Sequence, residues 1–371
     1  YIGLFSPTLF LTGQKYKKFR EEFFSEFEYV AGAMFRAIYF ADVKDTWSIG
    51  FTIWRTKSKE AQKVDAFKFK VLALSEIGKV EEVGVKTLWN LDHDQTLQSW
   101  LKSPSEKGQQ MKEQPIFTSA FKYTKKVKDI RSDALGFFIN DTNNIEAAAK
   151  GCYLMPSKIT RRIRTITLTE SNFSKSMVAF TGRNIVRPNW INQKDEFSAP
   201  DNQHPNYKKF EVLSVEYSIF SPKNNVLSFR DLKINDKTYN WRNEWFFLSN
   251  AEIREISDDL NNDDIYNDSI SNAGESFVYS YLEDHKEFLT PLAKELLQIA
   301  REIIKKTFQY RKIYHEANSQ YFLNTWDASW VQIKQMVRDL NSQLLEVFNE
   351  KFKAYELELL ELSADLKFFK Y

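Results

Sequence analysis

YIGLFSPTLFLTGQKYKKFREEFFSEF at residues 1–27, with the residues that follow it up to 56, is the stretch that decides the fold. Tyr1–Pro7 is a short apolar run stopped by Ser-Pro, which is typical of a buried parallel strand. From Gln14 to Phe27, aromatic residues recur every three or four positions, which predicts an amphipathic helix with one stripe facing a sheet. Ala33–Phe40 and Thr46–Arg55 read as strands. The stretch therefore predicts the order strand, helix, strand, strand.

This order resembles the second half of the catalytic domain in adenine-N6 DNA methyltransferases of restriction–modification systems. In that family a strand ending in a Pro-containing loop is followed by a basic helix, an aromatic-ended strand and a hairpin that closes the sheet. Ile2–Gly13 matches the first part and Phe40–Trp54 matches the last, at the right spacing. The resemblance implies a partial methyltransferase-type sheet within residues 1–56.

Two motifs of that family are missing from the chain. The glycine-rich cofactor loop does not occur, and neither does Asn-Pro-Pro-Tyr; the nearest strings, Arg187–Trp190 and His204–Tyr207, lack the double proline. The chain also starts without Met, in mid-strand. We therefore expect S-adenosylmethionine to be bound by a missing upstream half of the same protein. We expect no cofactor or metal on this fragment, and no methyl transfer by it alone.

Length and composition limit the protein class. A chain of 371 residues predicts about two or three domains. Hydrophobic residues at 43% and charged residues at 27% are typical of a soluble globular protein, and no apolar run is long enough to span a bilayer. We expect a cytoplasmic protein with no membrane partner. The single Cys152 excludes an internal disulfide, and the four histidines lack zinc-ligand spacing.

Charge is small overall but unevenly distributed. The net charge is +2, yet residues 122–187 are basic and residues 252–287 are acidic, so an anionic partner should meet the middle of the chain. The resemblance implies that this partner is double-stranded DNA. Aromatic residues make up 15% of the chain. Their abundance indicates either a large core or rings that stack on exposed bases.

The rest of the chain divides into three parts. Residues 57–114 read as a β-hairpin extension and linker, residues 115–256 as mixed short strands and helices, and residues 275–371 as two long antiparallel helices. Residues 170–200 resemble the start of the DNA target-recognition region of the same methyltransferases, and the resemblance implies that residues 115–256 form this DNA-binding region. The expected fold class is α/β plus α+β, with a C-terminal long-helix hairpin.

The resemblance carries one catalytic residue over. An enzyme that modifies adenine must pull the base from the duplex and hold its face against an aromatic ring. Phe40 matches that ring, with Tyr39 as the competing choice and a place in the core as the alternative. Asp195 and Glu196 are predicted to form an exposed turn.

Ten basic residues are candidates for DNA contacts. Lys158–Arg164 could form a phosphate clamp, since guanidinium groups offer paired donors to phosphate oxygens; the alternative is a solvated basic loop. The candidates are Lys15, Lys18, Arg36, Lys44, Lys158, Arg161, Arg162, Arg164, Arg183 and Arg230.

Three hypotheses of function follow. The first is the C-terminal part of a site-specific DNA adenine-N6 methyltransferase that supplies base flipping and target recognition. The second is a non-catalytic DNA-binding specificity subunit of a restriction–modification system. The third is a structural interaction module without a DNA role. Duplex binding at low salt separates the third from the others, because phosphate contacts dominate under that condition.

Overall fold

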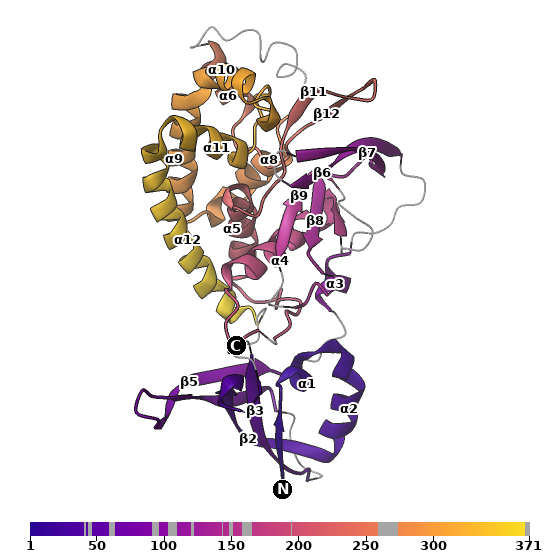
Figure 1. The fold of residues 1–371 in the computed structure, drawn as a ribbon, viewed down its shortest axis with the longest axis vertical. Helices are drawn as coiled ribbons and strands as arrows, with labels where there is room; N and C mark the ends of the chain where they lie inside the picture. Colours follow the sequence, from indigo (N-terminus) through magenta and orange to yellow (C-terminus); the bar gives the residue numbers. More distant parts are fainter. Residues whose placement is uncertain are drawn as a thin grey trace.

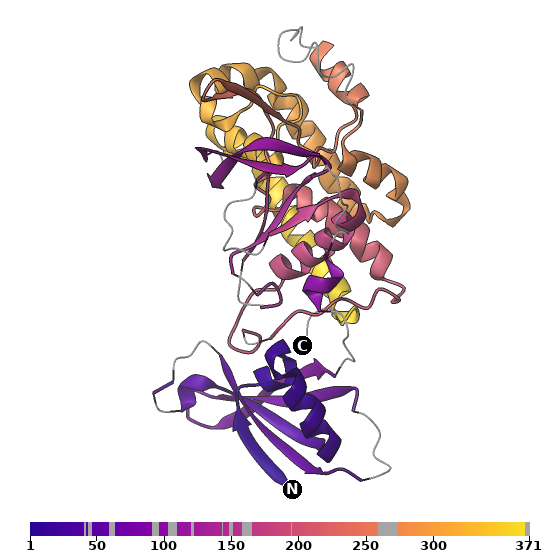
Figure 2. The ribbon, with the colours of Figure 1, turned by 90° about the vertical axis from the view of Figure 1, so that its right-hand side faces the viewer.

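The computed structural model describes residues 1–40, 42–43, 47–58, 64–90, 96–102, 110–119, 122–142, 144–147, 151–157, 165–193, 195–258 and 274–367. The N-terminal sheet with its two helices lies at one end of the elongated molecule, and most of the C-terminal helices lie toward the other (Figure 1). Figure 2 shows the same separation from the side.

The N-terminal sheet has the order β1-β3-β2-β4-β5. Its strands are β1 Ile2–Ser6, β2 Phe27–Arg36, β3 Ser48–Thr56, β4 Ala66–Leu74 and β5 Val80–Trp89. Strand β3 lies between β1 and β2 and is antiparallel to both, so β1 and β2 run in the same direction. Helices α1 Leu9–Thr12 and α2 Lys17–Glu26 connect them. The predicted order of strand, helix, strand, strand is confirmed.

Three details of the predicted N-terminal part are wrong. Strand β1 is an edge strand paired antiparallel with β3, and Phe5 on it is 61% exposed, so it is not a buried parallel strand. Strand β2 ends at Arg36, and a 3-10 turn at Ala37–Tyr39 precedes Phe40. The β4–β5 hairpin is no separate extension, because β4 pairs in parallel with β2 and completes the sheet.

Helix α2 packs its aromatic stripe on the sheet as its spacing predicts. The ring centroids of Phe23 and Phe24 lie 4.9 and 5.6 Å from that of Trp54. Buried positions alternate along β3, and Trp54 is the last of them. Buried Gly50 on the same face leaves room for Thr8, since a Cβ there would lie 3.0 Å from the Thr8 methyl group. Small residues on alternate positions of β3 thus let α1 approach the sheet.

Two aromatic side chains leave no room for a residue larger than glycine at Gly32 on β2. A Cβ at this position would lie 2.5 Å from the Tyr29 hydroxyl and 2.8 Å from a ring carbon of Phe69. We expect Gly32→Ala to lower the free energy of unfolding by about 1–3 kcal/mol, because the rings must move to admit the methyl group. Gly84→Ala on β5 is the matched control, since nothing lies within 4 Å of its Cβ. Denaturant titration of both variants checks this; equal midpoints would contradict it.

The middle of the chain adds a small sheet and two hairpins. The second sheet has the antiparallel order β10-β8-β9, with β8 Gly136–Asn140, β9 Cys152–Met155 and β10 Thr165–Leu168. The hairpins are β6 Met111–Ser119 with β7 Lys122–Arg131, and β11 Phe229–Ile234 with β12 Lys237–Trp241. The helices of this part are α3 Leu97–Trp100, α4 Phe173–Ile185, α5 Tyr207–Phe220 and α6 Asn250–Asp258.

The C-terminal region is helical, as predicted, but it is divided into more helices than the expected two. They are α8 Phe277–Asp284, α9 Pro291–Thr307, α10 Arg311–Ala317, α11 Trp330–Leu340 and α12 Glu346–Asp365. Thr290 starts α9, because its hydroxyl accepts the Ala293 N–H at 3.2 Å and Pro291 occupies the first turn. The Asn341 side chain likewise caps the turn between α11 and α12.

One buried cluster runs from Leu97 to Leu366. It joins α4 and α5 to α9, α11 and α12, so the middle of the chain and the C-terminal helices share a core. A separate cluster around Trp54 and Phe69 belongs to the N-terminal sheet. Within the described residues, no helix combines the length and the apolar character that a membrane crossing requires.

Candidate functional site

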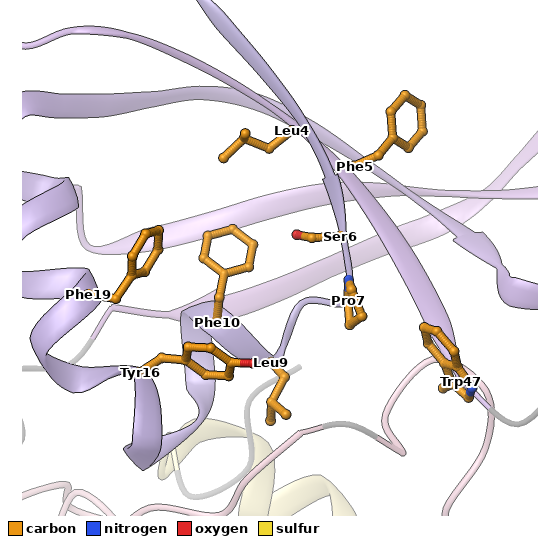
Figure 3. A pocket seen from close by; sticks show the side chains of 9 residues that line it. All are labelled: Leu4, Phe5, Ser6, Pro7, Leu9, Phe10, Tyr16, Phe19 and Trp47. Carbon is orange, nitrogen blue, oxygen red and sulfur yellow. The ribbon is translucent and has the colours of Figure 1, made fainter.

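An apolar cleft of about 590 Å³ lies along β1 and the helices that follow it (Figure 3). Most of its lining is hydrophobic, and its polar side-chain groups are the Ser6 and Tyr16 hydroxyls and the indole N–H of Trp47. The lining residues are Leu4, Phe5, Ser6, Pro7, Leu9, Phe10, Tyr16, Phe19 and Trp47.

The alternation of β1 directs its side chains to two sides. Leu4 and Ser6 point toward the side of Phe10 and Phe19, whereas Phe5 points the other way (Figure 3). The rings of Phe10 and Phe19 meet edge to face with centroids 6.1 Å apart. The cleft therefore lies where the edge of the sheet meets α1 and α2.

Phe40 contacts Phe5, the cleft-lining residue whose side chain points away from Phe10 and Phe19 (Figure 3). Its ring centroid is 6.2 Å from that of Phe5 and 6.5 Å from that of Phe35, and the side chain is half-buried. Phe5 in turn lies 4.5 Å from Phe51. Phe40 is thus part of a partly exposed aromatic cluster at the β1 edge, and it is not enclosed among aliphatic side chains.

Tyr39, the competing choice, has a structural contact instead. Its hydroxyl accepts the backbone N–H of Leu74 at 3.0 Å and so ties the turn after β2 to the end of β4. This hydrogen bond orients the Tyr39 ring toward the sheet. The geometry favours Phe40 over Tyr39 as a stacking residue.

Lys15, one of the predicted DNA contacts, lies beside the cleft. Lys15 and Lys18 are exposed, and the Lys15 ammonium lies 4.9 Å from the ring centroid of Tyr16, which lines the cleft. Arg20 on the same helix donates to the carbonyls of Phe10 and Gly13 at 3.0 and 2.6 Å and holds α1 against α2. Arg36 is half-buried at the end of β2.

Five predicted phosphate contacts lie outside the described residues. These are Lys44, Lys158, Arg161, Arg162 and Arg164.

Arg183 is placed where it cannot meet a phosphate without unfolding of its surroundings. It is 4% exposed; its guanidinium donates to the carbonyls of Ile145 and Ala147, the latter at 2.7 Å, and stacks over Phe197 at 5.2 Å. The prediction of a DNA contact is wrong here. Arg183 joins α4 to the segment after β8 by satisfying buried carbonyl oxygens.

The prediction of an exposed acidic turn is wrong for Asp195. Its carboxylate is 1% exposed and accepts from the ammonium of Lys86 on β5, which also donates to the Ile191 carbonyl at 2.8 Å. Trp190 and Ile191 pack against the N-terminal core. The segment after α4 therefore anchors the N-terminal sheet to the middle of the chain. Nothing in the sequence indicated that Lys86 pairs with Asp195, because the two residues are 109 positions apart.

Arg230 lies away from the cleft, in a second cavity at the base of the β11–β12 hairpin. In Figure 1 this hairpin and the N-terminal sheet occupy opposite ends of the molecule. The structure thus places Phe40 against Phe5 on β1 and Lys15 against Tyr16 of the cleft, and it separates Arg230 from both.

The chemistry of the β1 cleft is that of binding. Its lining contains no carboxylate, imidazole or thiol, so it offers a planar apolar group a stacking surface rather than an acid or base. Among the residues that the structure describes, no group of three or more His, Cys, Asp or Glu side chains could hold a metal ion.

Comparisons of the chain with protein-family models, curated proteins and solved structures found no match.

Proposed function

We propose that this chain is the C-terminal part of a site-specific, cytoplasmic DNA adenine-N6 methyltransferase. It supplies the aromatic surface that receives a flipped adenine, together with contacts to double-stranded DNA. The observation that carries the proposal is the position of Phe40, which is half-buried in a partly exposed aromatic cluster, with its ring centroid 6.2 Å from that of Phe5, a residue that lines the apolar cleft. The arrangement of the N-terminal strands supports it. β3 lies antiparallel between β1 and β2, which α2 connects, and the resemblance implies such a closing hairpin.

The cofactor is assigned to another part of the enzyme. The β1 cleft lacks a carboxylate for ribose hydroxyls, and the chain lacks the glycine-rich turn, so these residues do not fit S-adenosylmethionine. The proposal gives that role to an upstream half, which would lie along the free side of β1. In the described part of the chain, β1 pairs only with β3.

The residues of this chain would act on the base and on the backbone. Extrusion of a base costs a few kcal/mol in lost stacking and pairing, and an aromatic ring recovers about 1–3 kcal/mol of it. Phe40, supported by Phe5, provides that ring. Lys15 and Lys18 would attract phosphates of the duplex, a contribution that depends on salt and not on sequence.

Binding to a duplex with an unpaired adenine tests this function. The wild-type chain should bind a duplex with adenine opposite an abasic site more tightly than the fully paired duplex, because the unpaired base is easier to extrude. Phe40→Ala should lose most of that preference, roughly 5- to 100-fold, and Phe40→Tyr should keep it. Fluorescence anisotropy at fixed salt measures both affinities.

A second pair of variants separates stacking from charge. Lys15→Glu combined with Lys18→Glu should weaken binding to both duplexes alike and reduce the slope of log K against log salt by about 2. Lys286→Glu in the C-terminal region is the control, because this exposed lysine lies far along the chain. Duplex binding without any preference for the unpaired adenine would favour a DNA-binding specificity subunit, and no duplex binding at low salt would reject both.

A further inference from the structure

A second cavity, of about 270 Å³, lies where the β11–β12 hairpin meets the segment before α11. It combines aromatic walls with donors and an acceptor. The residues that line it are Phe229, Arg230, Asn240, Trp241, Arg242, Thr325, Trp326 and Asp327.

A break in strand pairing shapes this cavity. Asp231 has a φ of 55°, in the left-handed region, and the register of β11 against β12 shifts between Phe229 and Leu232. The Asn240 side-chain oxygen accepts the Asp231 N–H at 2.7 Å and holds the bulge in place. Bulges and strained residues of this kind redirect side chains near binding sites. Here the bulge lies next to Arg230, whose side chain lines the cavity.

Arg230 and Trp241 have unused donors at the cavity. The ion pair that the structure gives Arg230 is with Asp231 at 3.9 Å, beyond hydrogen-bond range, and its side chain is 34% exposed. Trp241 is 6% exposed, and its buried Nε1–H has no acceptor among the described residues.

Arg242 and Asp327 are fixed by contacts with the protein. Arg242 donates to the Gly274 carbonyl at 2.6 Å, pairs with Glu244 at 3.5 Å and lies 6.0 Å from the Trp326 ring centre. The Asp327 carboxylate accepts the Asn243 N–H at 2.9 Å and keeps further acceptor capacity. The cavity lining therefore combines guanidinium donors, a carboxylate and two indole rings.

We propose that this cavity receives one unstacked guanine base. The N7 and O6 acceptors of guanine match the fork of Arg230, which is the commonest specific contact to that base. Its N1–H and amino donors match Asp327. The indole rings of Trp241 and Trp326 line the cavity, with Lys112 over the first at 4.9 Å and Arg242 over the second at 6.0 Å, so each ring offers a base at most one face. Adenine would turn its amino donor toward the arginine, and a phosphate would meet the Asp327 carboxylate. The volume is below that of pockets for drug-sized ligands, which suits a single base.

This inference rests on the proposed function for the source of the base and adds a second base-binding site to it. Titration of the full chain with guanosine 5′-monophosphate, monitored by tryptophan fluorescence and by calorimetry, tests the cavity without DNA. Saturable binding of this nucleotide is expected, with adenosine, cytidine and thymidine monophosphates at least about tenfold weaker. Inorganic phosphate should not compete.

Variants of Arg230 assign the binding to the cavity. Arg230→Ala and Arg230→Lys should both weaken guanosine monophosphate binding about tenfold or more, because lysine lacks the paired donors. Lys233→Ala, an exposed residue of the same strand, should leave it unchanged. Equal binding of all nucleotides, competition by phosphate, or full affinity in Arg230→Lys would overturn the inference. A chain that prefers the unpaired adenine but ignores guanosine monophosphate would refute this cavity alone, whereas the reverse result would refute the proposed function alone.

Discussion

Lys86→Met should lower the free energy of unfolding by about 3–5 kcal/mol, the largest loss expected from any single substitution considered for this chain. Lys86 and Asp195 have side chains that are 2% and 0% exposed. Removing the ammonium leaves the Asp195 carboxylate buried without its counter-charge. The penalty of an uncompensated buried charge exceeds what the pair contributes over an apolar pair of similar size.

The double variant distinguishes this cause from loss of packing. Lys86→Met with Asp195→Leu removes both charges and should recover most of the loss, because an apolar pair fills the same space without a desolvated ion. Lys70→Met on the neighbouring strand is the matched control. The Lys70 and Glu82 side chains of its ion pair are 68% and 42% exposed. Removing the pair should therefore lower the free energy of unfolding by less than about 1 kcal/mol.

Denaturant unfolding monitored by circular dichroism measures the free energy of unfolding of the wild type, Lys86→Met, the double variant and Lys70→Met. A Lys86→Met variant no less stable than Lys70→Met would show that the Asp195 carboxylate reaches solvent or another partner. The expected result would also identify the segment after α4 as the anchor of the N-terminal sheet. In the proposed enzyme, that anchor would keep the β1 cleft at a fixed distance from the rest of the DNA-binding surface.

Local patterns in the sequence predicted local structure well. Helix α2, Lys17–Glu26, lies within the amphipathic stretch predicted at Gln14–Phe27, and the region from residue 275 is helical as predicted. The order of β1, α2, β2 and β3 follows from the change between helical and strand periodicity. Each of these features depends on neighbours a few residues apart, which a single sequence displays directly.

Features set by distant contacts could not be predicted in the same way. A lysine near the end of an edge strand usually protects that edge in water, yet Lys86 is buried by a loop more than a hundred residues later. The prediction of a DNA contact at Arg183 is wrong because the core encloses α4, and nearly every residue of this helix from Ser176 onward is buried. The bulge at Asp231 that brings Arg230 into a cavity has no signature in the strand pattern.

Glu216→Gln should stabilise the protein, and the gain should grow with pH. Glu216 on α5 is fully buried, and this burial, together with nearby Glu358, raises the pKa of its carboxyl to about 8 against the lowering effects of Tyr355 and Arg301. The Tyr355 hydroxyl has one proton and lies 2.8 Å from the Leu213 carbonyl and 3.2 Å from Glu216. If that proton goes to the carbonyl, a protonated Glu216 can donate to the tyrosine oxygen. The folded state therefore favours the neutral carboxyl.

The direction of the pH dependence follows from this shift. Between about pH 4.5 and pH 8 the unfolded chain loses the Glu216 proton while the folded chain keeps it, so stability falls as the pH rises. Glutamine cannot ionise and removes that slope. The stability difference between Glu216→Gln and wild type should be near zero at pH 4, increase through this window, and reach on the order of 4 kcal/mol above pH 8. Exposed Glu350 on α12 provides the control, as Glu350→Gln should change stability little at any pH. Urea titrations from pH 4 to pH 9 give the difference directly. A difference that stays constant across that range would mean that Glu216 ionises alike in both states and that its burial is relieved by solvent.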